Sequence, residues 1–170
     1  MMKSIGIRVE PSEIYYVILE LEDGGNFRFL PQKLVLPKAL NDDIPKQLSF
    51  IRNTLFSIIC EYDIQYAGLK TTEGLAQTPS VFRMNIEGVI QELFADSTIK
   101  TYFAGTYNSI AARVSNSSTT IKESCKGENN ILGIDNWGDL NQKYRECIFC
   151  ALAATNYQIG GGSNDKYQSC

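Results

Sequence analysis

The chain has 170 residues, 44% of them hydrophobic, with a net charge of −3 and a sequence pI near 5.0. This composition predicts one domain with its own core, and the acidic balance excludes a chain-wide basic field for non-specific nucleic-acid binding. Histidine is absent, which excludes Ser-His-Asp catalysis, Cys-His catalysis and zinc sites that use histidine.

Three antiparallel strands are predicted at the start of the chain. Residues 5–9 and 14–22 are strongly apolar and are joined by a short turn. The Asp-Gly-Gly-Asn sequence at 23–26 is a hairpin signal, so residues 27–36 are expected to form the third strand. Pro31 in that strand indicates a bulge or a sheet edge.

The middle of the chain predicts two helices and two strands. Asn41-Asp42-Asp43 supplies caps for a helix whose apolar residues recur every three or four positions as far as Tyr62. A short strand at 64–69 follows, and Thr78-Pro79 predicts the start of a second helix. Its buried stripe comprises Phe82, Ile86, Val89, Ile90 and Leu93, and Gly88 indicates a close approach to the sheet. Residues 98–103 are predicted as the fifth strand.

The last third of the chain contains a polar stretch and one more long helix. A short helix capped by Thr106 precedes residues 115–130, whose Ser, Thr and Asn content predicts a mobile loop. Residues 139–156 are predicted as the last helix, with one apolar face. We therefore expect a domain over residues 1–157 and a flexible tail over residues 158–170.

The five cysteines form an odd set without the spacing of a disulfide framework. Cys60, Cys147 and Cys150 lie in apolar helical patterns and are predicted to be buried. Cys147 and Cys150 form a CxxC pair, but a zinc site needs a second pair and a redox site needs a helix N-terminus. No apolar run is long enough for a membrane span and no signal-peptide pattern is present, so we expect a cytoplasmic protein.

Three segments carry a resemblance to a known family: Ile5-Gly6-Ile7-Arg8, Tyr66-Ala67-Gly68-Leu69-Lys70 with residues 83–90, and residues 145–153. Together with the predicted order of strands and helices, they resemble the RNase H-like fold, an α/β fold with a five-stranded mixed sheet that opens with three antiparallel strands and is flanked by helices. The chain is most similar to the RuvC-type Holliday-junction resolvase branch, and it also resembles small bacterial RNase H-like proteins with a similarly altered opening strand. The resemblance covers roughly residues 3–156.

The resemblance implies a metal-dependent nuclease site that this sequence does not preserve. The family holds two divalent ions about 4 Å apart with acids on strand one, at the end of strand four and on the last helix. Strand one of this chain has Arg8 at the matching position and strand four has Lys70, whereas the last helix retains Glu146. Because cations cannot ligate Mg²⁺ or Mn²⁺, this alignment predicts no catalytic residues and no metal cofactor.

A shifted set of acids is the alternative. Glu10 shares a strand face with Arg8 if the strand extends that far, Glu73 follows Lys70, and Asp139 precedes Glu146 by two helical turns. Convergence of Glu10, Glu73, Asp139 and Glu146 predicts a nuclease that uses Mg²⁺ or Mn²⁺. The simpler interpretation is that Glu10 and Glu73 are solvated turn residues and Asp139 is a helix cap.

The basic residues at the former ligand positions predict a pocket. Arg8, Lys70, Lys143 and Arg83 are expected to lie near Glu146, as an ion-pair cluster or as a binding site for phosphate or an acidic partner. Exposed aromatic residues and the acidic net charge favour a protein partner or a homo-oligomer over nucleic acid. The preferred hypothesis is a catalytically degenerate domain that binds a protein, in a nucleic-acid-processing or defence assembly. The other two are the shifted-acid nuclease and a non-catalytic nucleic-acid binder.

Overall fold

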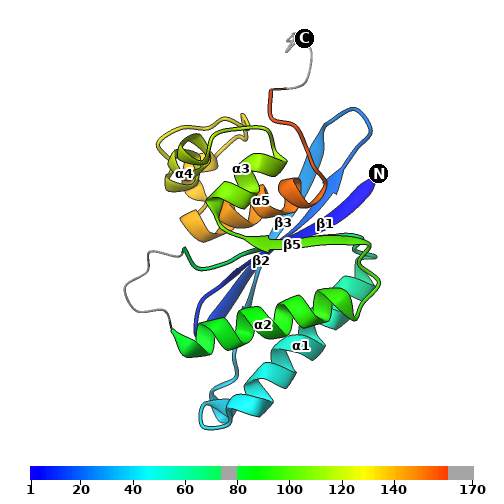
Figure 1. The fold of residues 1–170 in the computed structure, drawn as a ribbon, viewed down its shortest axis with the longest axis vertical. Coiled ribbons are helices and arrows are strands. Elements are labelled where there is room, and N and C mark those ends of the chain that lie inside the picture. The colour runs from blue at the N-terminus through cyan, green and yellow to red at the C-terminus, as the bar shows by residue number, and fades with distance from the viewer. Residues whose placement is uncertain (74–79, 161–170) are drawn as a thin grey trace.

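A five-stranded mixed sheet with helices on both faces forms the domain (Figure 1). The structure is a computed structural model that describes residues 1–73 and 80–160. The strand order is β3-β2-β1-β4-β5, in which β1, β2 and β3 pair antiparallel and β4 and β5 run parallel to β1. This arrangement confirms the predicted sheet. The strands are β1 (Met2–Val9), β2 (Glu13–Leu21), β3 (Phe27–Val35), β4 (Tyr66–Lys70) and β5 (Thr101–Gly105).

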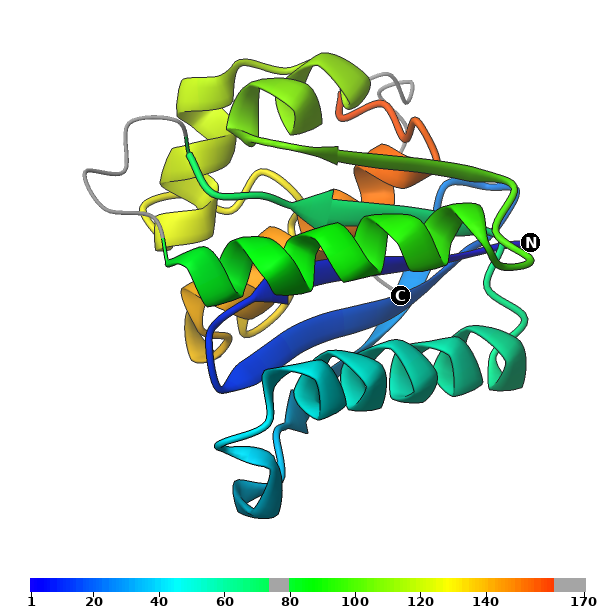
Figure 2. The same ribbon diagram turned by 60° about the horizontal axis from the view of Figure 1, so that its bottom comes forward.

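The helices form two layers, one on each face of the sheet (Figure 2). Helices α1 (Ile44–Glu61) and α2 (Val81–Ala95) cover one face, and their apolar stripes pack on Ile5, Ile7 and Val9 of β1. On the other face lie α5 (Gln142–Ala154), α3 (Tyr107–Arg113) and α4 (Ser118–Lys126). Two short 3₁₀ helices, η1 (Lys38–Leu40) and η2 (Trp137–Asp139), precede α1 and α5. No helix in the described residues is both long and apolar enough to cross a membrane.

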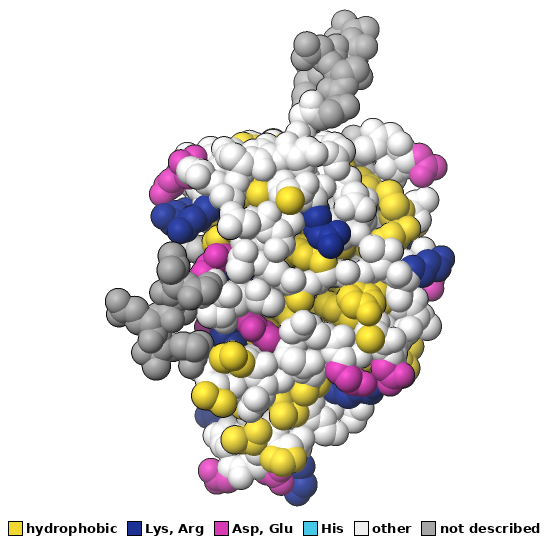
Figure 3. All heavy atoms as spheres, in the orientation of Figure 1, with side chains coloured by type: hydrophobic (Ala, Val, Ile, Leu, Met, Phe, Trp, Pro, Cys, Tyr) yellow, Lys and Arg dark blue, Asp and Glu magenta, His cyan; other side chains and the backbone are white. Residues whose placement is uncertain are grey.

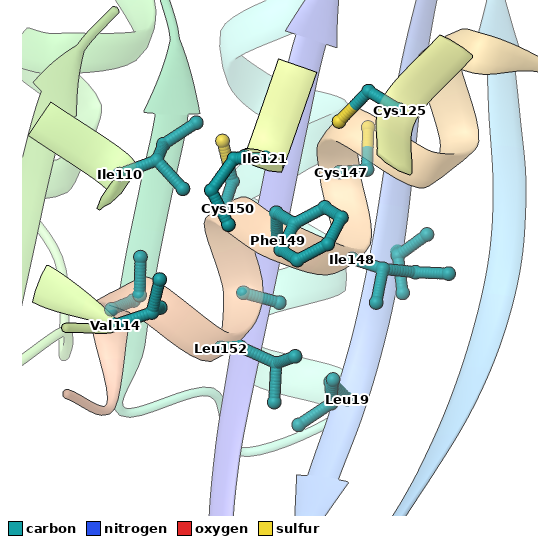
Figure 4. Packing of buried hydrophobic residues seen from close by; sticks show 14 of the residues in the cluster. Leu19, Ile110, Val114, Ile121, Cys125, Cys147, Ile148, Phe149, Cys150 and Leu152 are labelled. Carbon is teal, nitrogen blue, oxygen red and sulfur yellow. The ribbon is translucent and has the colours of Figure 1, made fainter. Parts of the chain in front are cut away.

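Helix α5 is buried on all sides after its first turn. Every residue from Arg145 to Ala154 is buried, so the prediction of a single apolar face was wrong. Figure 4 shows the reason, because Phe149 and Leu152 of α5 pack in one cluster with Leu19 of β2 and with Ile110 and Ile121 of the outer helices. A helix with apolar residues around its circumference is typical of a core position.

Two glycines allow α5 to approach the sheet closely. Gly6 of β1 and Gly68 of β4 are paired in register on the face that α5 covers. A Cβ atom at Gly6 would lie 1.8 Å from the carbonyl oxygen of Cys147, and one at Gly68 would lie 2.4 Å from that of Cys150. Any larger residue at either position therefore requires the helix to move.

The predicted loop at residues 115–130 was wrong, because α4 occupies its centre. Ser117 caps this helix by accepting the Thr120 N–H at 3.1 Å, and Gly127 ends it with a φ of 86°. Ile121 and Cys125 are buried against α5. These two apolar residues, four positions apart in a polar segment, are sufficient to give the helix a buried stripe.

Several local predictions also need correction. Cys60 is exposed rather than buried, whereas Cys147 and Cys150 are buried as predicted. Gly88 is exposed, and a Cβ atom added there would meet no atom within 4 Å, so it does not mark a contact with the sheet. Helix α2 is capped by Ser80, whose side chain accepts the Arg83 N–H. The predicted cap, Thr78-Pro79, lies outside the described residues. The fifth strand begins three residues later than predicted, at Thr101.

The end of the described chain contacts the outer helices. The Gln158 side chain donates to the carbonyl oxygen of Arg113 at 3.1 Å, and the Ile159 N–H donates to that of Val114 at 3.1 Å. The first residues of the predicted tail are therefore bonded to the domain, and residues 161–170 of that tail lie outside the described part of the chain.

Substitution of Gly6 by alanine should destabilise the protein, because its Cβ would overlap the α5 backbone. We expect the free energy of unfolding to fall by about 3 kcal/mol, at the upper end of overpacking costs. Gly88→Ala is the matched control, and it should raise stability by up to about 1 kcal/mol since that glycine is helical and unhindered. Urea denaturation measures both changes, and equal effects of the two substitutions would contradict the close approach of α5 at Gly6.

Candidate functional site

The candidate site lies where β1 and β4 end beneath α5. Arg8 and Lys70 are direct register partners on these neighbouring strands. They follow Gly6 and Gly68 by two residues, so their side chains leave the same face of the sheet, toward α5. Glu146 comes directly before Cys147, whose backbone contacts Gly6. Arg8 and Glu146 are in direct contact, and Lys70 is linked to Glu146 through Tyr107.

Arg8 and Glu146 form a buried ion pair. The Arg8 Nε donates to Glu146 Oε2 at 2.5 Å, and the two side chains are 16% and 3% exposed. Arg8 also donates to the carbonyl oxygen of Val9 at 3.0 Å and lies 3.3 Å from a Glu10 carboxylate oxygen. Burial alone would lower the pKa of Arg8, but the Glu146 and Glu10 carboxylates outweigh that effect and raise it. Arg8 is therefore always charged, and the Glu146 and Glu10 carboxylates balance its charge.

Tyr107 at the start of α3 completes the contacts of Glu146. Its hydroxyl donates to Glu146 Oε1, the same oxygen that accepts the Gln142 amide at 3.3 Å. Burial, followed by the Glu146 charge, raises the pKa of Tyr107 well above its usual range. The sequence analysis missed Tyr107, because it is one of nine tyrosines and the fold alone brings α3 to this position.

Lys70 has its own carboxylate partner. Its Nζ lies 2.8 Å from Glu73 Oε1, donates to the carbonyl oxygen of Thr71 at 2.8 Å, and lies 4.4 Å from the centre of the Tyr107 ring. Glu73 also accepts the Tyr107 N–H at 3.1 Å. Burial would raise the pKa of Glu73, but Lys70 and the Tyr107 N–H together hold it below its usual value. The Tyr107 side chain thus links the Lys70 pair to the Glu146 pair.

A third ion pair borders the site from α2. Arg83 lies 3.2 Å from Glu87, which also accepts the Thr72 hydroxyl at 3.3 Å. Burial raises the pKa of Glu87, against the opposing effects of Thr72, Arg8 and Lys70. Arg83 therefore has a carboxylate partner of its own and does not contact Glu146. Glu87 was missed, although its position four residues after Arg83 and beside the buried Ile86 is a sequence signal for such a pair.

Lys143 lines an open pocket of about 320 Å³ together with Arg8, Asn141, Gln142 and Glu146. Its Nζ lies 5.2 Å from the centre of the Tyr15 ring, and in the described residues it forms no ion pair. Asp139 is exposed at the end of η2 and the structure records no bond between it and the other predicted acids. The pocket thus contains Arg8, Lys143 and Glu146 from the predicted set, and Lys70 lies beside it.

The site does not fit the divalent ions that the fold family uses. Two of the matching ligand positions carry cations, and Glu10, Glu73 and Glu146 are each paired with one of those cations. Within residues 1–73 and 80–160, no three acidic or cysteine side chains are arranged to hold a metal ion. The geometry instead forms an ion-paired core, with Lys143, which has no ion-pair partner in the described part of the chain, at its rim.

Comparisons with known proteins show which solved structures have a similar fold. No family model matches the sequence, and no curated protein matches it. Among solved structures, RuvC of Thermus thermophilus is similar with a TM-score of 0.70 and 11% identity, over 92% of this chain and 95% of that one. The same protein in complex with a Holliday junction substrate gives a TM-score of 0.66.

The yeast mitochondrial Holliday junction resolvase Ydc2 is also similar, with a TM-score of 0.51, 13% identity, and coverage of 92% of this chain and 77% of that one. These similarities extend over nearly the whole chain, and at this identity they concern the fold. The chain has the RNase H-like fold in its RuvC-type form, as the resemblance implied.

Removal of the Glu146 charge should strongly destabilise the domain. In Glu146→Gln the Arg8 guanidinium is left buried without its main carboxylate, and we expect a loss of roughly 3 kcal/mol in the free energy of unfolding. The double variant Arg8→Met, Glu146→Gln removes the uncompensated charge and should recover much of that loss. Urea denaturation of Arg8→Met, Glu146→Gln and the double variant gives the interaction energy between the two side chains. If the two single losses in free energy of unfolding simply add in the double variant, the residues do not form a direct pair.

The Lys70–Glu73 pair should make stability depend on pH. The folded-state pKa of Glu73 is lowered, so its ionised carboxylate stabilises the folded protein. This stabilisation is complete above the usual pKa of 4.5 and is lost as pH falls through the lowered pKa. Glu73→Gln should therefore cost about 1 kcal/mol at neutral pH, since Glu73 is 43% exposed and partly screened. Urea denaturation at several pH values should show that the difference in free energy of unfolding between wild type and Glu73→Gln becomes smaller in acid. A difference that stays constant with pH would show that the Glu73 charge is not its source.

Proposed function

We propose that this chain is a catalytically degenerate RNase H-like domain that works by binding a protein partner. The observation that carries the proposal is the register pairing of Arg8 with Lys70, at the two positions where the resemblance places metal ligands. Each cation has a carboxylate partner, Glu146 for Arg8 and Glu73 for Lys70. The acids that remain at this end of the sheet are therefore committed to these cations.

Electrostatics explains why this site disfavours a divalent ion. A unit charge at 4 Å from another contributes about 4 kcal/mol at a protein-like effective dielectric, and the effect doubles for a divalent ion. Arg8 and Lys70 would both oppose such an ion, and Glu146 would have to exchange Arg8 for it. Deprotonation of Arg8 cannot relieve the repulsion because the Glu146 and Glu10 carboxylates raise its pKa.

The outer face supports a binding role. Val81 and Met84 of α2 and Ile44 of α1 are exposed hydrophobic residues on the α1–α2 layer. Figure 3 shows hydrophobic side chains gathered over this layer in the lower part of the view. Exposed apolar residues of this kind are typical of protein contacts. We propose that residues 1–157, together with Gln158 and Ile159 that bond to them, act as the binding domain, in the cytoplasm and within a nucleic-acid-processing or defence assembly.

Non-catalytic nucleic-acid binding is the second candidate, and Lys143 favours it. This lysine borders the open pocket and has no ion-pair partner within the described residues. Under this candidate, binding weakens steeply with salt and Lys143→Ala reduces affinity for every nucleic-acid sequence alike. The shifted-acid nuclease has less support, because Glu10 and Glu73 are ion-paired and Asp139 lies apart from them.

Calorimetric titration with Mn²⁺ tests the proposal. The wild-type protein should show no binding heat, because its acids are engaged by Arg8 and Lys70. The double variant Arg8→Asp, Lys70→Asp restores acids beside Glu146 and is the positive control, in which a Mn²⁺ isotherm should appear. Cleavage of branched or hybrid nucleic acid by the wild type in Mg²⁺ or Mn²⁺, abolished by Glu146→Ala, would overturn the proposal.

A further inference from the structure

The two edges of the sheet differ in what protects them. β3 and β5 are the outermost strands, so each has backbone groups on one side that β2 or β4 does not use. Proteins normally blunt such edges with proline, charge or a covering segment, because an open edge pairs with other strands. The hydrogen bonds at the ends of β3 and β5 determine which of their residues face outward.

Proline protects the β3 edge. The Glu22 N–H donates to the Asn26 carbonyl at 2.8 Å, and the Leu36 N–H donates to the Ser12 carbonyl at 3.2 Å. In an antiparallel ladder bonded and non-bonded pairs alternate, so the odd-numbered residues of β3 point their backbone groups away from β2. Pro31, at the centre of this row, has no N–H to offer, which confirms that it marks an edge.

The β5 edge is open. The Thr71 N–H donates to the Gly105 carbonyl at 2.9 Å, so the backbone of Gly105 faces β4. In a parallel ladder every second residue turns its N–H and C=O the same way, so Phe103 also faces β4, whereas Tyr102 and Ala104 face outward. Within the described residues, no strand or loop hydrogen-bonds to the backbone of Tyr102 or Ala104. The strand also contains no proline.

Apolar side chains border this edge on the face that α2 covers. Tyr102 is 46% exposed with its ring 6.1 Å from that of Phe94, and Ala104 is exposed on the same face of the strand. β5 crosses the front of the molecule in Figure 1, and in the same orientation Figure 3 shows hydrophobic side chains at the middle of the surface with basic side chains beside them. The edge is therefore accessible, and an added strand would meet apolar residues on this face.

A guanidinium borders the edge on the opposite face. Arg113, the last residue of α3, stacks on the Phe103 ring with its Cζ atom 4.5 Å from the ring centre. In the described part of the chain this guanidinium takes part in no ion pair and no hydrogen bond. Lys100, exposed just before β5, likewise has no ion-pair partner among those residues. Two uncompensated positive charges thus lie along this edge.

We propose that β5 pairs antiparallel with an extended segment of a partner protein in which an acidic residue stands between two apolar residues. The two apolar residues lie opposite Tyr102 and Ala104 and form with them the four backbone bonds that the edge leaves open. The acidic residue lies opposite Phe103, and its side chain points to the face of the sheet that carries Arg113. In this mode of recognition the backbone bonds supply affinity and the side chains supply specificity.

The charge of the edge selects an acidic segment. Residues directly opposite in an antiparallel pair have their Cβ atoms about 5 Å apart, so a glutamate opposite Phe103 reaches the guanidinium stacked on that ring. An arginine binds a carboxylate through two parallel hydrogen bonds, and a guanidinium stacked on an aromatic face keeps those donors available. A second β5 in the same place would instead set Arg113 and Phe103 against their own copies, so this edge does not suit self-association.

This inference rests on the proposed role of the domain in binding a protein, and it gives that role a surface and a class of partner. It is separate from the ion-paired site, because no hydrogen bond or ion pair in the described chain links Arg113 to Arg8, Lys70 or Glu146. Failure of an acidic peptide to bind would leave the result of the Mn²⁺ titration unchanged. A Mn²⁺ isotherm would in turn overturn the degenerate site and leave the peptide test unaffected.

Fluorescence anisotropy with a short labelled peptide tests the backbone pairing. The probe has Val-Glu-Val at its centre, flanked by threonine and serine, and should bind the full chain with a Kd below about 1 mM. Methylation of the two valine backbone nitrogens removes the donors that face β5 and should weaken binding roughly tenfold or more. Methylation of the central glutamate nitrogen is the matched control, because that N–H points away from β5 and its loss should leave the Kd unchanged.

A second peptide with Val-Gln-Val at its centre isolates the charge. The wild type should prefer the glutamate peptide roughly fivefold, as for the stronger exposed ion pairs, and Arg113→Gln should bind both peptides equally. Arg28→Gln is the matched control, since Arg28 is an exposed arginine on the proline-protected edge, and it should keep the preference. Because each variant is compared with itself on two peptides, a general loss of affinity does not affect the result.

Amide hydrogen exchange locates the bound peptide. The Tyr102 and Ala104 amides should exchange more slowly in the complex, whereas the Phe103 amide, which already faces β4, should not change. Failure of the glutamate peptide to bind, equal binding after methylation of its valines, or equal affinity for the two peptides in the wild type would each overturn the proposal. Slow exchange of these two amides without peptide, increasing with protein concentration, would also overturn it, because it would assign the edge to a second copy.

Discussion

The contact between the paired glycines and the backbone of α5 is the constraint on which the site depends. Gly6 and Gly68 leave no room for a side chain beneath the carbonyls of Cys147 and Cys150, so they set both the height and the position of the helix. Glu146 precedes Cys147, and Arg8 is the next residue after Gly6 on the same strand face. The helix position that the glycines permit therefore brings this acid to this guanidinium. A shift of α5 would disrupt core packing and the ion pair together.

The charged groups beneath α5 alternate in sign. Glu10, Arg8 and Glu146 follow one another, and Tyr107 connects Glu146 to the Lys70–Glu73 pair. Arg8 and Lys70 thus each have an anion beside them, which offsets the cost of burying a charge. In a metal-binding relative of this fold the positive charge would come from an ion; here it comes from the chain. Such pairs contribute little net stability compared with an apolar core, but the loss of one partner is costly.

Sequence reasoning recovered the sheet because local signals specify it. The hairpin turns, the caps at residues 41–43 and the apolar alternation are all encoded within a few neighbouring residues. Arg8, Lys70 and Glu146 were found because their segments resemble the motifs in which the RNase H-like family carries its metal ligands. Tyr107 and Glu87 were missed because their roles arise from tertiary packing, which brings α3 and α2 to the ends of β1 and β4. The polar composition of α4 concealed a helix that depends on packing against α3 and α5, together with its caps at Ser117 and Gly127.

The central claim is that Arg8 and Lys70 occupy the place of the metal ions. Paramagnetic broadening of amide signals by Mn²⁺ tests it most directly, because unpaired electrons relax nearby nuclei even when binding is too weak for calorimetry. The account predicts that the amides of Arg8, Lys70 and Glu146 broaden no more than those of exposed acidic residues such as Asp96. Selective broadening of these three amides at low Mn²⁺ concentration would contradict it, since it would place a divalent ion among the ion pairs.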